Sequence, residues 1–207
     1  MFAVARRAVF FPLPVLAALA FTACGSSSKT TSTTPTGASA AANSGTTGSG
    51  VLVGKQTSVA LNPATSQLLK EHQIVVTAVA PATYRTTLLW PVSGGQIAVA
   101  SAAGTIDHTG GVRLSHAGTS VQVTSFIIDT STKQVTALIG GQRLPIFAVD
   151  TSSEKRQTGV GGTIVEGGLK FTLIEGAATA LNSALGVSAF KAGQVFGTAT
   201  ITLAVKT

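Results

Sequence analysis

The chain has 207 residues, of which 44% are hydrophobic and 10% are charged, and its formal net charge is +7. The positive charge is dispersed, without a run of Lys or Arg or an aromatic platform, and this argues against nucleic-acid binding. The single cysteine excludes an intramolecular disulfide and a metal site built from several cysteines.

The first 23 residues have the layout of a secretory signal peptide. Arg6 and Arg7 form a short basic start, and an apolar run over residues 8–23 ends directly before Cys24. This run is shorter than the roughly 20 residues that a membrane-spanning helix needs. It also contains two prolines, so a signal peptide that is removed fits better than a retained helix.

The small residues just before Cys24, in the sequence Phe-Thr-Ala-Cys, resemble the lipobox of bacterial lipoproteins. This resemblance implies that Cys24 is diacylated on sulfur and becomes the first residue of the mature protein. Two or more acyl chains anchor a protein stably, so we expect an extracytoplasmic protein attached to the cell membrane through Cys24. A plain secretory leader cleaved elsewhere, and export by the twin-arginine route through Arg6 and Arg7, are the alternatives.

Residues 25–50 consist almost wholly of Gly, Ser, Thr, Ala and Asn. Such a composition buries too little apolar surface to fold, so it predicts a disordered tether. We therefore predict three parts: a signal peptide (1–23), the lipidated Cys24 with its tether (24–50), and a single β-rich globular domain (51–207).

The globular part alternates apolar and polar residues with a period of two, which is typical of antiparallel strands with one buried face. The alternation is clearest over 112–115, 121–124, 169–173 and 201–205, and Gly-rich turns recur between such runs. The fold class predicted is mainly β, either an antiparallel β-sandwich or a barrel-like meander, with two short helices.

The two helices interrupt this alternation. Asn62 is a good N-cap and Pro63 suits the first helical position, so one helix is expected from there to His72. The second is expected from about Glu175 to Leu185. Each helix lies between strand-like segments with similar leucine spacing, which indicates two strand–helix–strand units on either side of a central meander.

No catalytic motif is apparent, since the chain has no Gly-x-Ser-x-Gly sequence and no cysteine beyond Cys24. Asp129 and Asp150 each end a strand-like run before Ser or Thr, which favours a role in turns. We predict a protein that is not an enzyme. An envelope hydrolase using dispersed acids is a weaker alternative that requires clustering of Asp107, Asp129, Asp150 or Glu166 in one cleft.

Candidate ligand-binding residues are Tyr84, Trp90 and His108. Tyr84 and Trp90 are the only Tyr and Trp in the chain, and His108 lies between two predicted strands. The alternative for Trp90 is packing in the core, and for Tyr84 a position at a sheet edge. No metal site is expected, because a site from His108 and His116 would lack visible carboxylate support.

Three segments together resemble the central part of HtaA-type domains, which are surface and secreted modules of Actinobacteria: Pro-Val-Ser-Gly-Gly at 91–95, Gly-Thr-Ile-Asp-His-Thr-Gly-Gly-Val at 104–112, and Val-Gln-Val-Thr-Ser-Phe at 121–126. Some members bind haem through a tyrosine in an aromatic-rich segment near the domain's start. The corresponding segment here, 58–73, has no aromatic residue, so Tyr84 would have to replace that ligand.

The sequence thus predicts a membrane-anchored, extracytoplasmic β-domain that binds an unknown small ligand, glycan or envelope protein without a cofactor. The alternative, implied by the resemblance, is a haem-acquisition module of the HtaA type with haem as its ligand.

Overall fold

The computed structural model describes residues 48–206. The signal peptide, Cys24 and residues 24–47 of the expected tether lie outside the described residues. The helices are α1 (Pro63–Glu71) and α2 (Glu175–Leu185). The strands are β1 (Ser49–Leu61), β2 (Val75–Val79), β3 (Thr83–Tyr84), β4 (Leu88–Ala98), β5 (Gly104–His108), β6 (Gly111–His116), β7 (Thr119–Asp129), β8 (Gln134–Ile139), β9 (Gln142–Asp150), β10 (Lys155–Gly159), β11 (Thr163–Leu173) and β12 (Val195–Lys206).

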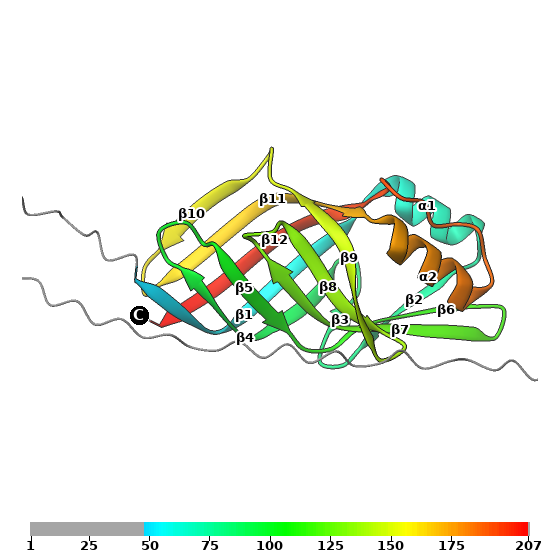
Figure 1. Cartoon of the computed structure of the whole chain (residues 1–207), viewed down its shortest axis with the longest axis horizontal. Coiled ribbons are helices and arrows are strands. Elements are labelled where there is room, and N and C mark those ends of the chain that lie inside the picture. Colours follow the sequence, from blue (N-terminus) through cyan, green and yellow to red (C-terminus); the bar gives the residue numbers. More distant parts are fainter. Residues whose placement is uncertain (1–47, 207) are drawn as a thin grey trace, which may run out of the picture. The chain divides into compact units, whose positions relative to one another are not determined.

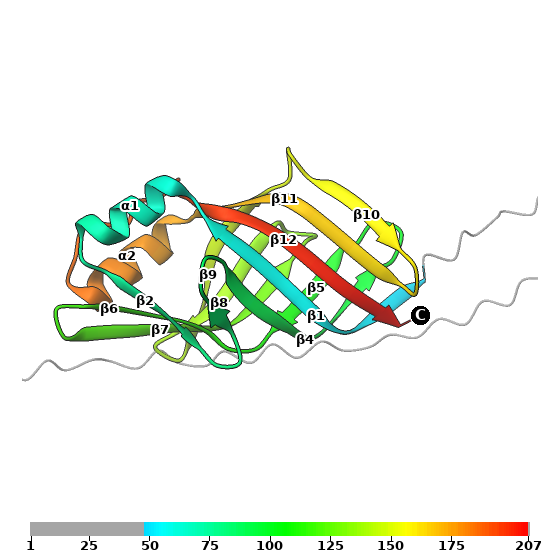
Figure 2. The same ribbon diagram turned by 180° about the vertical axis from the view of Figure 1, so that it is seen from behind.

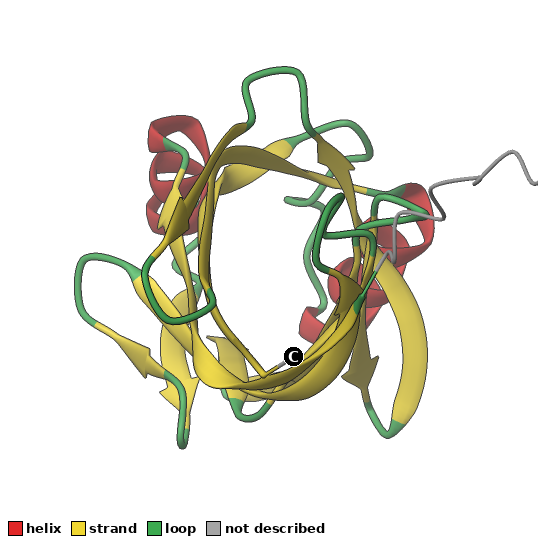
Figure 3. Ribbon diagram, turned by 90° about the vertical axis from the view of Figure 1, so that its left-hand side faces the viewer, coloured by secondary structure: helices red, strands yellow, loops and turns green. Residues whose placement is uncertain are grey.

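Eight antiparallel strands close into a barrel in the order β7-β5-β4-β1-β12-β11-β9-β8, and the pairing of β8 with β7 completes the ring. Figure 3 shows this ring of strands from one end. The prediction of a mainly β fold is confirmed, and the closed ring decides between the two architectures in favour of the barrel.

Strand β7 connects the barrel to a hairpin that extends beyond it. Its first half pairs with β6, its second half pairs with β5, and its register against β8 shifts between Thr124 and Ile127. Ser125, between these two residues, has a φ of 53°, as expected where a bulge bends a strand. Strand β2 adds to β6, while β3 pairs with β4 and β10 pairs with β11 outside the ring.

The predicted alternation corresponds to the buried face of the sheet. Inward residues such as Val112, Leu114, Phe171 and Leu203 are buried, whereas Arg113, between Val112 and Leu114, is exposed. Each of these strands therefore turns one face toward the core and the other toward solvent, as the period-two pattern requires.

Both helices lie at one end of the barrel, away from the carboxyl end of the chain (Figures 1 and 2). In α1 the side chain of Asn62 accepts a hydrogen bond from the Ala64 N–H at 2.9 Å, which confirms the predicted cap. Helix α2 has the bounds that its sequence predicts and ends at Gly186 in the left-handed conformation, with φ 66°. It packs on β7 and β9 through its buried face, which includes Leu181 and Leu185.

The two expected strand–helix–strand units occur as β1-α1-β2 and β11-α2-β12, but they are not equivalent. Strands β11 and β12 are neighbours in the barrel, whereas β1 lies in the barrel and β2 adds to the hairpin of β6 and β7. Within residues 48–206, neither helix is long and apolar enough to cross a membrane.

Aromatic rings fill the barrel interior on the side of the helices. Trp90 stacks on Phe126 at a centroid distance of 4.1 Å and lies 6.4 Å from Phe171. Phe147 continues the row, at 5.6 Å from Phe171 and 5.0 Å from Phe196. Such rings bury large apolar areas and prefer offset stacked or tilted contacts, so this row contributes to the stability of the core.

Candidate functional site

The barrel holds a pocket of about 220 Å³ at the end opposite the helices, which we call the mouth pocket. Its walls come from the β4–β5, β7–β8 and β9–β10 loops and from β11. The lining residues are Ser101, Ala102, Ala103, Ile128, Thr130, Lys133, Val149, Thr151, Glu154, Glu166 and Leu169.

Glu166 is the buried charge of this pocket, with 3% of its surface exposed. It follows the inward residue Ile164 on β11, so the strand's alternation directs it into the barrel. A bulge at Gly167 and Gly168 then shifts the register before Leu169.

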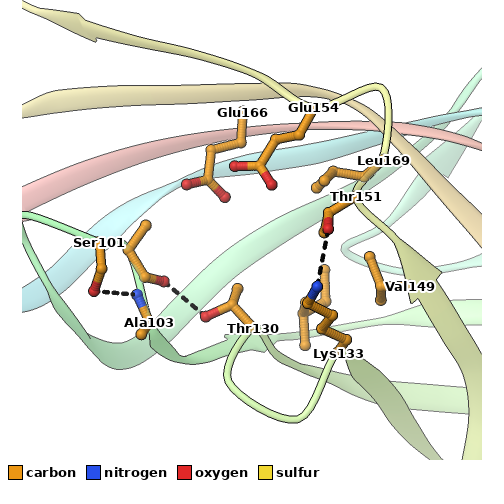
Figure 4. Close-up of a pocket in the computed structure, with 11 residues that line it drawn as sticks. Ser101, Ala103, Thr130, Lys133, Val149, Thr151, Glu154, Glu166 and Leu169 are labelled. Carbon is orange, nitrogen blue, oxygen red and sulfur yellow. Dashed lines mark hydrogen bonds between the residues drawn. The ribbon is translucent and has the colours of Figure 1, made fainter.

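Gly168 brings the β9–β10 loop against β11. Its φ is 79°, and a Cβ atom at this position would collide with the carbonyl oxygen of Ser153. Because glycine tolerates both the conformation and the close approach, the loop packs against β11 and places Glu154 beside the pocket. Figure 4 shows the carboxylates of Glu154 and Glu166 both directed into it.

Burial raises the pKa of Glu166, and the negative charge of Glu154 raises it further, while Arg156 opposes the shift. The Arg156 Nε lies 3.7 Å from Glu166 Oε1. The same guanidinium donates hydrogen bonds to the carbonyl oxygens of Val99 at 2.8 Å and Ala100 at 3.1 Å. Arg156 therefore joins the β10–β11 hairpin to the β4–β5 loop and only partly compensates the carboxylate of Glu166.

The opposite wall of the pocket is polar, and its side chains form hydrogen bonds within the protein. The Thr130 hydroxyl donates to the Ala102 carbonyl at 2.7 Å and accepts from the Gly104 N–H at 2.8 Å, so it holds the β4–β5 loop in place. Lys133 is exposed, and its Nζ donates to the Thr151 hydroxyl at 3.2 Å (Figure 4). The pocket thus has an acidic wall at Glu154 and Glu166 and a basic group at Lys133.

From the sequence, Glu166 is only one of several dispersed acids, and Glu154 is not predicted to be a site residue. The sequence does contain a signal for a buried carboxyl group, because Glu166 occupies an inward position of β11 whose other inward residues are apolar. Of the four acids considered for a hydrolase, only Glu166 lines the pocket; Asp129 and Asp150 instead accept hydrogen bonds from the N–H groups of Ser131 and Ser152, as predicted for turn residues.

Two of the three candidate ligand-binding residues are neighbours in the core. Trp90 is 1% exposed and His108 is 3% exposed, with their rings edge-on at 6.2 Å. The Trp90 Nε1 is buried without a hydrogen-bond partner in the described part of the chain. Tyr84 lies apart from them on the short strand β3, partly buried against the core. A ligand-binding role for these three residues stays a prediction.

The imidazole of His108 is held by two hydrogen bonds. Its Nδ1 lies 3.1 Å from the Phe126 carbonyl oxygen, to which it donates, and its Nε2 lies 2.7 Å from the Thr57 hydroxyl, which donates to it. Burial lowers the pKa of His108 to about 4, partly opposed by backbone hydrogen bonds. The ring is therefore neutral at physiological pH.

The other histidines lie near the helices. His72 caps the carboxyl end of α1 and is exposed, whereas the Nδ1 of half-buried His116 lies 3.2 Å from the Leu185 carbonyl oxygen at the end of α2. Within residues 48–206, no group of three or more His, Cys, Asp or Glu side chains is placed to hold a metal ion.

No protein-family model matches the chain, and no curated protein matches it. Two solved structures from Corynebacterium glutamicum are similar. The C-terminal domain of HtaA matches with a TM-score of 0.58 and 12% identity, over 77% of this chain and 100% of that domain. The haem-binding protein HtaB matches with a TM-score of 0.44 and 11% identity, over 76% of this chain and 95% of HtaB. The described domain is therefore similar in fold to the C-terminal domain of HtaA, in agreement with the resemblance found in the sequence.

Proposed function

We propose that this chain is an extracytoplasmic lipoprotein whose barrel binds a small, positively charged organic molecule in the mouth pocket and does not act on it as an enzyme. The observation that supports this proposal is the buried carboxyl of Glu166, which faces a cavity of about 220 Å³.

The pocket's size limits the ligand. Sites for drug-sized molecules have volumes of about 300–1,000 Å³, so a cavity of about 220 Å³ suits a smaller metabolite. A buried charge is costly unless it is paired. The Arg156 Nε lies 3.7 Å from Glu166 Oε1, which is longer than a hydrogen bond, so the pairing is incomplete. A ligand ammonium group between Glu154 and Glu166 would supply the missing compensation. A carboxylate or hydroxyl on the same ligand would face Lys133, so amines and zwitterions are the expected classes.

Calorimetric titration with a panel of small primary amines, quaternary ammonium compounds and amino acids tests this proposal, with neutral alcohols of similar size beside them. We expect saturable binding of cationic members. Replacing Glu166 by Gln keeps the shape and removes the charge. Hydrogen bonds to charged groups contribute about 1.5–3 kcal/mol, so affinity should fall by about 10- to 150-fold.

Glu175→Gln is the matched control, because Glu175 lies in the first turn of α2, among the helices. Binding should also weaken as the pH falls, since the raised pKa of Glu166 makes its carboxylate take up a proton at higher pH than an ordinary carboxyl group. Neutral alcohols that bind as tightly as the amines, or a Glu166→Gln variant with unchanged affinity, would contradict the proposal.

Anchoring through Cys24 belongs to the same proposal and rests on the lipobox-like sequence before it. Mass spectrometry of the protein extracted from membranes should show a diacylated or triacylated amino-terminal cysteine. The Cys24→Ala variant should be absent from the detergent phase in a phase-separation assay. An unmodified Cys24 in membrane-extracted protein would refute this part.

Haem binding is the second candidate, supported by the sequence resemblance to HtaA-type domains and by the fold shared with the C-terminal domain of HtaA. The mouth pocket is too small for a porphyrin, so haem would bind at another surface, with Tyr84 as the axial ligand. A haemin titration followed by Soret absorbance, repeated with Tyr84→Phe, tests this. A stoichiometric spectral change that the variant loses would support haem binding, and a flat titration would exclude it.

A further inference from the structure

Exposed valines gather at one end of the described domain. Four large hydrophobic residues are exposed in residues 48–206, and three of them are Val51 (54%), Val53 (61%) and Val160 (99%). Val51 and Val53 lie on β1, and Val160 lies in the turn between β10 and β11. The fourth, Val75 on β2, belongs to the hairpin sheet.

The three valines come from neighbouring parts of the barrel. Val51 pairs with Lys206 on β12, and the Val205 N–H donates to the Gly162 carbonyl in the β10–β11 turn at 3.0 Å. Figures 1 and 2 show the start of β1, the end of β12 and this turn together at the end of the barrel away from the helices.

This end also carries positive charge. Lys55 and Lys206 are exposed on β1 and β12, and Lys55 reaches β11 through a 3.0 Å hydrogen bond to the Thr163 hydroxyl. The segments 48–56, 159–163 and 200–206 contain no Asp or Glu. We call the three valines and these two lysines the rim patch.

The place where the chain continues toward its amino terminus points to a membrane as the occupant of this patch, a step that rests on the proposed lipidation of Cys24. Ser49 begins β1 at this end, and the Gly48 carbonyl accepts from the Val99 N–H at 3.1 Å. The chain runs from Gly48 back to Cys24, so a lipid on Cys24 would be joined to the domain beside the rim patch. Exposed apolar side chains surrounded by lysines are suited to the interface of an anionic bilayer.

We propose that the rim patch docks on the surface of an anionic phospholipid membrane, with Val160 entering the interface and the two lysines facing lipid phosphates. The β4–β5 loop, which lines the mouth pocket, then lies next to the membrane, because its Val99 is bonded to Gly48. The docking surface acts in addition to the lipid on Cys24 and is independent of the ligand in the mouth pocket.

The test uses the mature chain from residue 24 with Cys24→Ser, which removes the lipid. Vesicles of phosphatidylglycerol and phosphatidylcholine in equal parts are compared with vesicles of phosphatidylcholine alone in a sedimentation assay. We expect binding to the anionic vesicles that weakens with salt. Each lysine near such a surface contributes about a fivefold factor in partitioning. The double variant Lys55→Gln, Lys206→Gln should therefore lose on the order of 25-fold in partitioning.

Insertion is measured at Val160 itself. The Cys24→Ser chain has no other cysteine, so Val160→Cys can be labelled with an environment-sensitive fluorophore, whose emission should shift to the blue on anionic vesicles. A label at Val75→Cys, on β2, is the matched control and should not shift. Lys70→Gln and Lys191→Gln, close to the helices, are the controls for charge.

Thermal unfolding of every variant shows whether the fold is retained. Equal sedimentation with both vesicle types, no sedimentation with either, or equal shifts at positions 160 and 75 would overturn the proposal. Because the tested chain is not lipidated and no pocket ligand is present, these outcomes are distinguishable from a failure of the proposed ligand binding or of lipidation at Cys24.

Discussion

Acid should destabilise the domain through His108. In the folded protein this ring is buried between Thr57 and Phe126, and its pKa is lowered to about 4 from 6.5. In the unfolded chain the ring takes up a proton as the pH falls through about 6.5, while the folded protein keeps it neutral until about pH 4. Stability from this group is therefore full above pH 6.5 and is lost between pH 6.5 and 4. At about 1.4 kcal/mol per pKa unit, the loss is about 3 kcal/mol.

The measurement is the free energy of unfolding in urea at pH 7, 6, 5 and 4 for the native protein and for His108→Gln. The variant should be less stable at pH 7 because the Thr57 contact changes, but its stability should depend less on pH by about 3 kcal/mol over this range. Glu166 acts in the opposite direction, since its raised pKa favours the folded state as the pH falls. Comparing the two proteins cancels its contribution.

His72→Gln is the control for this comparison, because His72 is exposed at the end of α1. It should leave the pH dependence of the native protein unchanged. The reasoning about burial is refuted if His108→Gln loses stability toward pH 4 as steeply as the native protein does.

Three further substitutions probe the fold. Asn62→Ala removes the cap bond to Ala64 and should lower the free energy of unfolding by about 1 kcal/mol; an unchanged urea midpoint would contradict the capping role. Phe171→Ala opens a cavity in the aromatic row and should cost about 3–5 kcal/mol, and a loss under 1 kcal/mol would show that the row is not a tight core. Gly168→Ala should displace the β9–β10 loop and weaken ligand binding more than Gly161→Ala, which meets no neighbour at its own turn; equal effects on titration would contradict the packing argument.

The helices and strands could be predicted well because helix caps and apolar periodicity depend only on residues that are close together in the sequence. The residues that cap α1 lie directly at the start of that helix. The apolar face of α2 is formed by residues of the helix itself. Alternation in β6, β7, β11 and β12 likewise depends only on which face of each strand is buried.

Closure of the barrel could not be predicted in the same way. Alternation in a strand shows which of its faces is buried, but it does not show which strand pairs with it. The pairings of β1 with β12 and of β7 with β8, which close the barrel, therefore could not be predicted from alternation. The bend of β7 at Ser125, which lets one strand serve both the hairpin and the ring, has no distinctive sequence, because the residue is not a glycine.

The candidate site was difficult to predict for a related reason. Trp90 is a candidate because it is the only Trp in the chain, and His108 because it lies between two predicted strands, yet the barrel places both in its interior. The pocket instead depends on Glu166 and Glu154, which come together only when the β9–β10 loop packs on Gly168. The inward position of Glu166 was visible in the alternation of β11, but the cavity that it faces depends on loops from three other parts of the chain.

The two ends of the barrel interior are therefore built differently. Near the helices, the row from Phe126 through Trp90 to Phe196 fills the interior, so substitutions there change stability. At the other end the interior is left open, and the buried Glu166 is retained at an electrostatic cost that an apolar residue would not carry. Because a costly buried charge beside a cavity contributes little to folding, it supports the proposed ligand binding. Glu166→Leu should accordingly raise the free energy of unfolding at neutral pH while abolishing binding of amines. A variant that loses stability instead would show that Glu166 serves the fold through Arg156.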